Sequence, residues 1–116
     1  MTRNRKQKET AESKEKAKFR RTATWKKFRQ RMRSKNKVDF ITEKPLLKGF
    51  QVHHCDMRLE NYKELKEENF YCLNKTTHEM IHFLFRYTNW RELLERIKIV
   101  LEKMESLNKQ EQSKEL

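Results

Sequence analysis

All four histidines of this 116-residue chain lie between positions 53 and 82. An adjacent pair, His53 and His54, is followed by His78 and His82, which are spaced i, i+4. On a helix that spacing places both rings on one face, with about 5–6 Å between Cβ atoms. Neutral imidazoles that converge at about 2.0–2.2 Å hold divalent metals. The cluster therefore predicts a metal site, and the fold must bring the two pairs together.

The composition restricts the chain to a small, helix-rich α+β fold. Only 34% of residues are hydrophobic and 40% are charged, so a large core is not available. One glycine and one proline are too few for a barrel or sandwich with many tight turns. We expect a single folded unit of about 50–80 residues, a size at which a metal often supplements the core.

Around the histidines, the pattern predicts two strands followed by a helix. The segment FQVHH at 50–54 alternates between two faces, and a second strand is expected at 69–73. VDFI at 38–41 is a further short strand candidate. Residues 55–68 are charged and lack strong periodicity, so we expect a loop there.

The helix that follows carries His78 and His82. Asn74 or Thr76 can cap it, and Glu79 lies in its first turn if Thr76 is the cap. Its expected buried stripe consists of Met80, Ile81, Leu84 and Phe85.

The positive charge is concentrated at the N-terminus. Residues 1–37 hold 16 Lys and Arg against 3 Glu, a balance of +13, whereas residues 38–116 hold 13 against 14. We expect a disordered basic tail or a fraying helix over 1–18 and a basic helix over 19–37, capped by Thr22 or Thr24. Its apolar stripe is Trp25, Phe28 and Met32. Seven cations on its other faces are predicted to contact nucleic acid: Arg20, Arg21, Lys26, Lys27, Arg29, Arg31 and Arg33. A solvated helix without a ligand is the alternative.

Residues 89–108 form the clearest amphipathic helix, with Asn89 as its cap. Its stripe either packs against the strand–strand–helix unit or mediates a homodimer. Residues 109–116 are expected to fray. The apolar positions are Trp90, Leu93, Leu94, Ile97, Val100, Leu101 and Met104.

The sequence points to an intracellular protein. The first 18 residues lack the apolar segment of a signal peptide, and no apolar run approaches the ~20 residues of a membrane span. Two cysteines, Cys55 and Cys72, are too few for a disulfide framework and are expected to be reduced. A polyanion is the natural partner of the basic segment, and DNA, RNA or an anionic surface would qualify by charge alone.

The order His-His, Asn, His-x-x-x-His resembles the HNH endonuclease family, whose fold is the ββα-metal motif. The segments FQVHHCD, ENFYCLN and THEMIH match its strand, second strand and helix. The pattern is most similar to the colicin-type nuclease domains and to phage-encoded HNH proteins, and it covers residues 38–87. A W-x-x-x-R stretch at Trp25 and Arg29 is similar to the helix that precedes the motif in phage members. The resemblance thus places an HNH nuclease domain at 38–108.

The resemblance implies a role for each site residue. His54 would be the general base that activates water, and Asn69 would orient it or brace the loop. His53, His78 and His82 would hold one divalent ion, with Zn, Mg, Mn, Ni or Co all acceptable to the site. The implied activity is hydrolysis of phosphodiester bonds in DNA, in the cytoplasm of a bacterial host and with phage or mobile-element partner proteins.

The chain departs from many phage HNH proteins at one point. Those proteins carry Cys-x-x-Cys pairs around the motif, whereas the corresponding region here, DFITEKPL, has no cysteine. Support for the site is therefore expected from the apolar stripes, including the C-terminal helix. Two alternatives to a nuclease remain. One is a nucleic-acid-binding protein with a structural metal and a fourth ligand from Cys55 or Asp56. The other is a degenerate HNH fold with a scaffold role.

Overall fold

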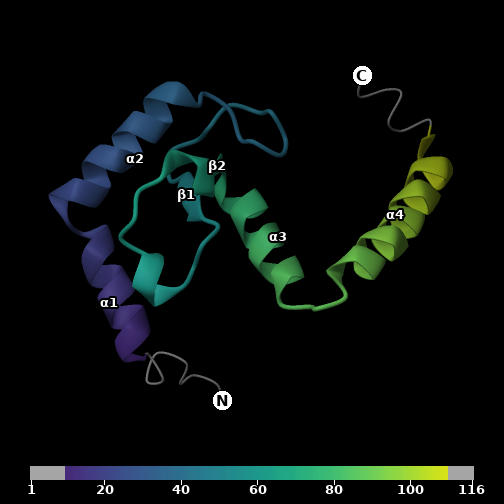
Figure 1. The fold of residues 1–116 in the computed structure, drawn as a ribbon. Helices are drawn as coiled ribbons and strands as arrows, with labels where there is room; N and C mark the ends of the chain where they lie inside the picture. The colour runs from purple at the N-terminus through teal and green to yellow at the C-terminus, as the bar shows by residue number, and fades with distance from the viewer. Residues whose placement is uncertain (1–9, 110–116) are drawn as a thin grey trace, which may run out of the picture. The chain divides into compact units, whose positions relative to one another are not determined.

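The computed structural model describes residues 10–109 and is of the mixed α+β class. The chain forms two compact units, Met1–Glu79 and Met80–Leu116, and the boundary between them falls inside a helix, α3. Two short 3-10 turns lie between the strands, at Leu59–Asn61 and Glu67–Asn69. Figure 1 shows the elements in chain order: α1 Ala11–Arg20, α2 Ala23–Lys35, β1 Gln51–His54, β2 Phe70–Leu73, α3 Lys75–Phe85 and α4 Trp90–Leu107.

A regular helix, α1, occupies most of the segment expected to be disordered or fraying, so the prediction of disorder is wrong over residues 11–18. Residues 1–9 lie outside the described residues. Thr10 caps α1 by accepting a hydrogen bond from the Ser13 backbone N–H at 3.0 Å. Phe19 anchors its other end, because its buried ring contacts Trp25 and Tyr62 at centroid distances of 6.1 and 6.0 Å. A cap at one end and an aromatic anchor at the other stabilise a helix whose sequence is otherwise almost entirely polar.

The basic segment predicted as one helix over 19–37 is divided between α1 and α2. Thr22 begins the second helix and accepts a hydrogen bond from the Trp25 N–H at 3.2 Å, which selects it over Thr24 as the cap. The predicted apolar stripe is confirmed, since Trp25, Phe28 and Met32 are all buried. One face of α2 therefore belongs to the core, and its cationic faces lie outside.

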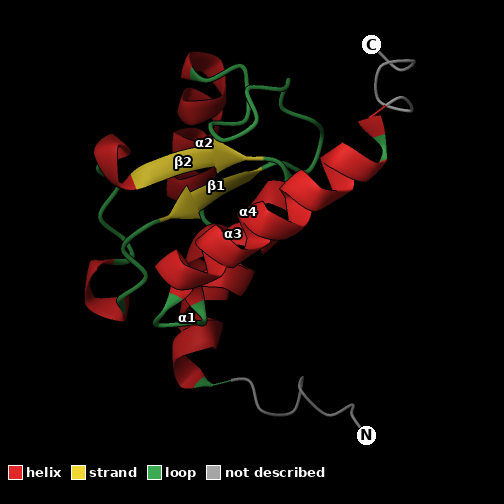
Figure 2. Ribbon diagram, turned by 90° about the vertical axis from the view of Figure 1, so that its right-hand side faces the viewer, coloured by secondary structure: helices red, strands yellow, loops and turns green. Residues whose placement is uncertain are grey.

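The two strands pair antiparallel and form the only sheet within the described residues (Figure 2). Val52 pairs with Cys72 and His54 with Phe70, whereas His53 pairs with Tyr71. Because side chains alternate along a strand, the first two pairs share one face of the sheet and the third lies on the other. The face with His54 packs against α2.

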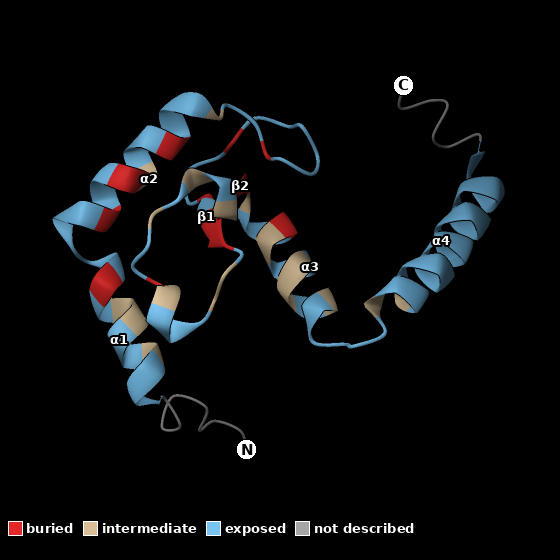
Figure 3. Ribbon diagram, in the orientation of Figure 1, coloured by how far each residue is buried: buried red, intermediate tan, exposed pale blue. Residues whose placement is uncertain are grey.

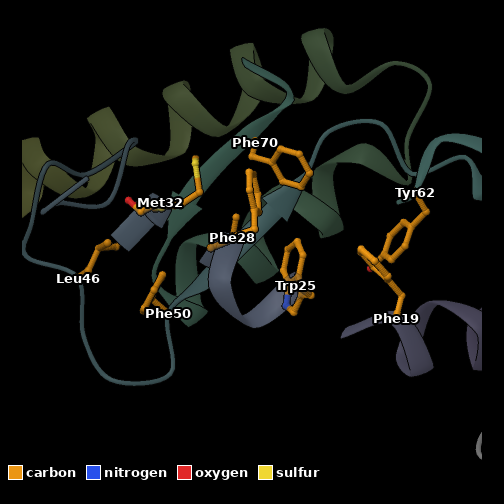
Figure 4. Close-up of a cluster of buried hydrophobic side chains, with 10 residues drawn as sticks. Phe19, Trp25, Phe28, Met32, Leu46, Phe50, Tyr62 and Phe70 are labelled. Atoms are coloured by element: carbon orange, nitrogen blue, oxygen red, sulfur yellow. Dashed lines mark hydrogen bonds between the residues drawn. The ribbon is translucent and has the colours of Figure 1, made fainter. Parts of the chain in front are cut away.

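The hydrophobic core lies between α1, α2 and this face of the sheet (Figures 3 and 4). Phe28 is fully buried and its ring meets that of Phe70 edge to face at 4.7 Å. Trp25 contacts both rings. The buried cluster consists of Phe19, Trp25, Phe28, Met32, Leu46, Phe50, Val52, Tyr62, Phe70 and Cys72.

Residues 38–41 do not form the predicted strand. Val38 makes a single bridge with Pro45, and a tight turn separates them. Asp39 explains the difference. Its carboxylate accepts hydrogen bonds from the backbone N–H groups of Ile41 and Thr42 at 2.8 and 2.9 Å, which closes a turn in place of an extended ladder.

Helix α3 begins at Lys75, directly after Asn74 and not after Thr76. Glu79 consequently lies beyond the first turn, a position within that turn having been expected only with Thr76 as the cap. The predicted buried stripe is also wrong at two positions, because Met80 and Phe85 are 52% and 64% exposed. The less exposed positions are Thr77, His78, Ile81, His82 and Leu84, so the histidine pair occupies the face that the sequence pattern assigned to apolar residues.

The C-terminal helix agrees with its predicted bounds to within one residue at each end. Asn89 occupies the cap position without a side-chain capping bond, and no residue of α4 is buried. Whether its stripe serves packing within the chain or a homodimer stays a prediction. Residues 110–116 lie outside the described range. None of the helices between residues 10 and 109 is both long and apolar enough to cross a bilayer.

Candidate metal centre

Three of the four histidines converge, as predicted, on one potential metal site. His53 comes from β1, and His78 and His82 come from α3. One nitrogen from each ring lies within 4.8 Å of the others. The rings of His53 and His78 meet edge to face with centroids 5.1 Å apart. His53 is buried, and the two helical histidines are half-buried.

This spacing suits a single divalent ion. Metal–nitrogen bonds of about 2.0–2.1 Å place the ligand nitrogens of a tetrahedral ion about 3.3 Å apart. Small rotations of the three imidazoles bring their nitrogens from the observed spacing to that separation. Three protein ligands also leave a coordination position for water or a substrate oxygen, as catalytic sites require.

The backbone explains why the three rings meet. His78 and His82 are one helical turn apart, so α3 presents both on one face. His53 faces them because strand alternation turns it away from the α2 core. The start of α3 is fixed by Asp39, whose second carboxylate oxygen accepts a hydrogen bond from the Asn74 N–H at 2.7 Å. Asn74 in turn accepts one from the Leu47 N–H at 2.8 Å.

Asp39 is the structural residue that the sequence analysis missed. It is fully buried. Burial raises its pKa, but hydrogen bonds from the backbone of Thr42, Asn74 and Ile41 and from the side chain of Thr77 outweigh this effect and leave the pKa lowered. A charged residue inside the apolar pattern VDFI was the available signal, because a buried carboxylate requires several donors.

His54 lies on the opposite face of the sheet from the three potential ligands. Its ring is stacked between Tyr62, at a centroid distance of 3.8 Å, and Trp25, at 5.0 Å, while Phe70 meets it edge to face. Its Nε2 is 3.2 Å from the backbone oxygen of Tyr62. The structure therefore does not bring His54 into the histidine cluster.

The enclosure of the His54 ring determines its protonation state. Burial is the main cause that lowers its pKa, and the charges of Arg20 and Lys16 add to it. The hydrogen bond to Tyr62 and the charge of Asp56 oppose the shift, and the pKa falls to about 4. The ring is thus neutral at pH 7. When Nε2–H donates to the Tyr62 oxygen, Nδ1 keeps the lone pair.

Asn69 ends the second 3-10 turn, immediately before β2. Its backbone oxygen accepts a hydrogen bond from the Cys55 N–H at 2.9 Å, which ties the end of β1 to the start of β2. Asn69 and His54 line the same small pocket, together with Asp56, Asn61, Glu64 and Phe70. The expected proximity of Asn69 to His54 is present, whereas no hydrogen bond between their side chains is among those found.

The two residues considered as a fourth ligand have other surroundings. Asp56 accepts hydrogen bonds from the side chains of Arg58 and Asn61, and the Arg58 bond is the main cause that lowers its pKa. Cys55 is exposed. Within the part of the chain that the structure describes, the cluster contains the three histidines and neither of these residues.

The seven lysines and arginines predicted to contact nucleic acid divide into two groups. Four of these arginines already interact within the chain. Arg20 donates to the Tyr62 hydroxyl at 2.6 Å, and Arg29 donates to the Phe50 oxygen at 2.7 Å. Arg33 lies over the Phe50 ring, and Arg31 is 3.9 Å from Glu67.

The other three cations are exposed. Between residues 10 and 109, no hydrogen bond or ion pair engages the side chains of Arg21, Lys26 or Lys27. These side chains can bind phosphate without first breaking a structural bond.

Comparison with protein-family models, curated proteins and solved structures found no match.

Proposed function

We propose that this chain is a metal-dependent nuclease of the HNH type, which hydrolyses phosphodiester bonds in DNA. The main observation that supports this proposal is the convergence of His53, His78 and His82 from a strand and a helix. The antiparallel pair followed by α3 has the element order of a ββα-metal motif. With three protein ligands, the site suits catalysis better than a purely structural role.

The ion would supply Lewis acidity and stabilise negative charge on the phosphate in the transition state. His53, His78 and His82 would hold it, and α3 and β1 would orient their rings before substrate binds. Preformed ligands require little rearrangement during the reaction. Arg21, Lys26 and Lys27 would contact the phosphate backbone, which favours nucleic acid in general and provides little base specificity.

His54 remains our proposal for the general base, with Asn69 as the residue that braces the loop beside it. A pKa of about 4 leaves the imidazole neutral at pH 7 with a free lone pair, but it also makes the ring a weaker base than an ordinary histidine, so efficient proton transfer requires that the pKa rise when substrate binds. Its place in the aromatic stack means that water must reach it from the polar pocket that it shares with Asn69. Because His54 and the three potential ligands lie on opposite faces of the sheet, this role requires a rearrangement that brings the His54 ring to the phosphate held by the metal, and it has its own test below.

A supercoiled-plasmid assay tests the nuclease. The full chain is incubated with Mg²⁺, Mn²⁺, Co²⁺, Ni²⁺ or Zn²⁺, with a chelator control. We expect nicked or linear product with at least one ion and none with the chelator. His78→Ala should lose both cleavage and metal binding measured by calorimetry. Thr76→Ala is the matched control, because Thr76 is an exposed residue of the same helix and lies outside the cluster.

The alternative function is non-catalytic nucleic-acid binding, either by a structural metal site or by a degenerate HNH fold. It predicts metal and DNA binding without cleavage in any ion. Cleavage that persists in His78→Ala or in the chelator would contradict the metal-centred mechanism directly.

A further inference from the structure

Two aromatic side chains lie beside the candidate metal centre and are largely exposed. Tyr71 is paired directly with His53 across the two strands, so both side chains are on the same face of the sheet. Side chains at such paired positions have Cβ atoms about 4.5–5.5 Å apart. Tyr71 is 40% exposed, and Phe40 contacts it with ring centroids 4.4 Å apart. Phe40 itself is 62% exposed.

The exposed aromatic pair is held in a fixed position. Phe40 follows the buried Asp39, whose carboxylate closes the turn and bonds to the start of α3. The backbone N–H of Phe40 donates to the oxygen of Cys72 in β2 at 3.0 Å. Glu43 closes the turn with a φ of 61°, and its N–H donates to the Asp39 oxygen at 2.8 Å. Two large apolar rings are thus presented to solvent on a rigid support, an arrangement that contributes little to the core.

A groove of about 700 Å³ adjoins the pair, within the ~300–1,000 Å³ of typical ligand clefts. Its charged residues are mixed. Glu67 is 2.9 Å from Lys35, so these two charges offset each other. The groove is therefore not a cationic surface of the kind that binds a nucleic-acid phosphate backbone. Its carboxylates can instead accept hydrogen bonds from the amino groups of bases. Its charged and aromatic lining consists of Lys35, Lys37, Phe40, Glu43, Glu67, Glu68, Phe70 and Tyr71.

We propose that Phe40 and Tyr71 form a stacking platform for an unpaired nucleobase, and that the substrate is single-stranded DNA or DNA with unpaired bases beside the cleaved bond. This inference rests on the proposed function and specifies its substrate class. Stacking on aromatic rings is the common means of holding single strands, because every base has an aromatic face. A base inside a duplex is already stacked on its neighbours and cannot use the platform. The adjacent His53 would then place the metal at the phosphate next to the captured base.

Binding measured in EDTA tests the platform without any cleavage. The probe is a single strand of about 12 nucleotides that contains one 2-aminopurine. The full chain should quench the probe on binding. Phe40→Leu keeps an apolar side chain but removes the ring, and we expect the affinity to fall about tenfold. Phe40→Trp should retain the affinity. Leu47→Ala is the matched control, since Leu47 is 65% exposed and should leave binding unchanged.

The same variants are compared on a duplex of the same sequence, where Phe40→Leu should have no effect. The proposal is overturned if Phe40→Leu binds the single strand as tightly as the parent. An equal loss on single strand and duplex also overturns it, because that result indicates a general change of the surface. If the EDTA results are as expected but neither plasmid nor single-stranded circular DNA is cut in any metal, the nuclease proposal fails and the platform remains. If plasmid is cut but Phe40→Leu has no effect on binding, the platform alone fails.

Discussion

Replacement of Asp39 by asparagine is the sharpest test of how the fold supports the metal centre. The Asp39 carboxylate accepts three backbone hydrogen bonds, from Ile41 and Thr42 on one oxygen and from Asn74 on the other, at 2.7–2.9 Å. It is fully buried. An amide keeps one oxygen acceptor, but its NH₂ group would face a backbone N–H in place of the second oxygen.

The expected cost follows from these contacts. A hydrogen bond to a charged group contributes about 1.5–3 kcal/mol, and an unsatisfied buried donor costs about 1–3 kcal/mol. Asn at this position preserves the bonds on one oxygen and loses the charge and the other bond, so we expect the free energy of unfolding to fall by about 2 kcal/mol. For a domain of this size, that change lowers Tm by about 8–16 °C. Asp56→Asn is the control, because the Asp56 carboxylate is not part of the core, and its effect on Tm should be much smaller.

The pH dependence provides a second signature. The pKa of Asp39 is lowered in the folded chain, so its charge stabilises the fold above the unfolded pKa of about 3.9 and this contribution is lost as the pH falls below that value. Thermal unfolding should therefore show a constant difference between parent and Asp39→Asn from about pH 5 to 8, and a smaller one below about pH 4. Calorimetric titration with Zn²⁺ should also show affinity reduced on the order of tenfold, because Asp39 fixes the start of the helix that carries His78.

Two results would refute this reasoning. An unchanged Tm would mean that solvent satisfies the three N–H groups when the charge is removed. A stability difference that grows as the pH falls would mean that Asp39 is protonated in the folded state at neutral pH.

Three further variants test the remaining assignments. His54→Phe retains a ring between Tyr62 and Trp25, so thermal stability should change little, and plasmid cleavage should be abolished if His54 is the base; normal cleavage by the folded variant would show that it is not. The double change Lys26→Gln with Lys27→Gln should reduce the slope of log K against log salt for DNA binding by about 2, and an unaltered slope would place the phosphate contacts elsewhere. Arg29→Gln should instead lower Tm with little effect on that slope, because Arg29 donates to the Phe50 oxygen.

The metal cluster could be predicted from the sequence because its geometry is local. A spacing of i, i+4 fixes the relation of His78 and His82 on any helix, and alternation places His53 and His54 on opposite faces, so that only one of them can join the pair. Both relations depend only on the type of secondary structure. They were therefore accessible before the arrangement of the elements was known.

The environment of His54 and the bond between Asp39 and the start of α3 depend on distant residues and were not predicted. Asp39 bonds to Asn74, 35 positions later, and His54 is enclosed by Trp25 and Tyr62 from separate segments. The turn itself is closed locally by the N–H groups of Ile41 and Thr42, so the Asp within VDFI was a usable signal, whereas its bond to Asn74 was not foreseeable. The same limit applies to the arginines of α2, since a count of positive charges does not reveal that Arg29 is bonded to a backbone oxygen.

The adjacent histidines explain how so small a core can support a metal site without a zinc knuckle. His53 faces the cluster, while His54, its neighbour, is held between the rings of Trp25 and Tyr62. Because successive residues of a strand are rigidly related, fixing the ring of His54 also fixes the backbone that directs His53. The aromatic core contributed by α1 and α2 thus provides the support that was expected from the apolar stripes of the chain. A cavity at Trp25 should therefore weaken metal binding even though Trp25 lies on the opposite side of the sheet from the three ligands.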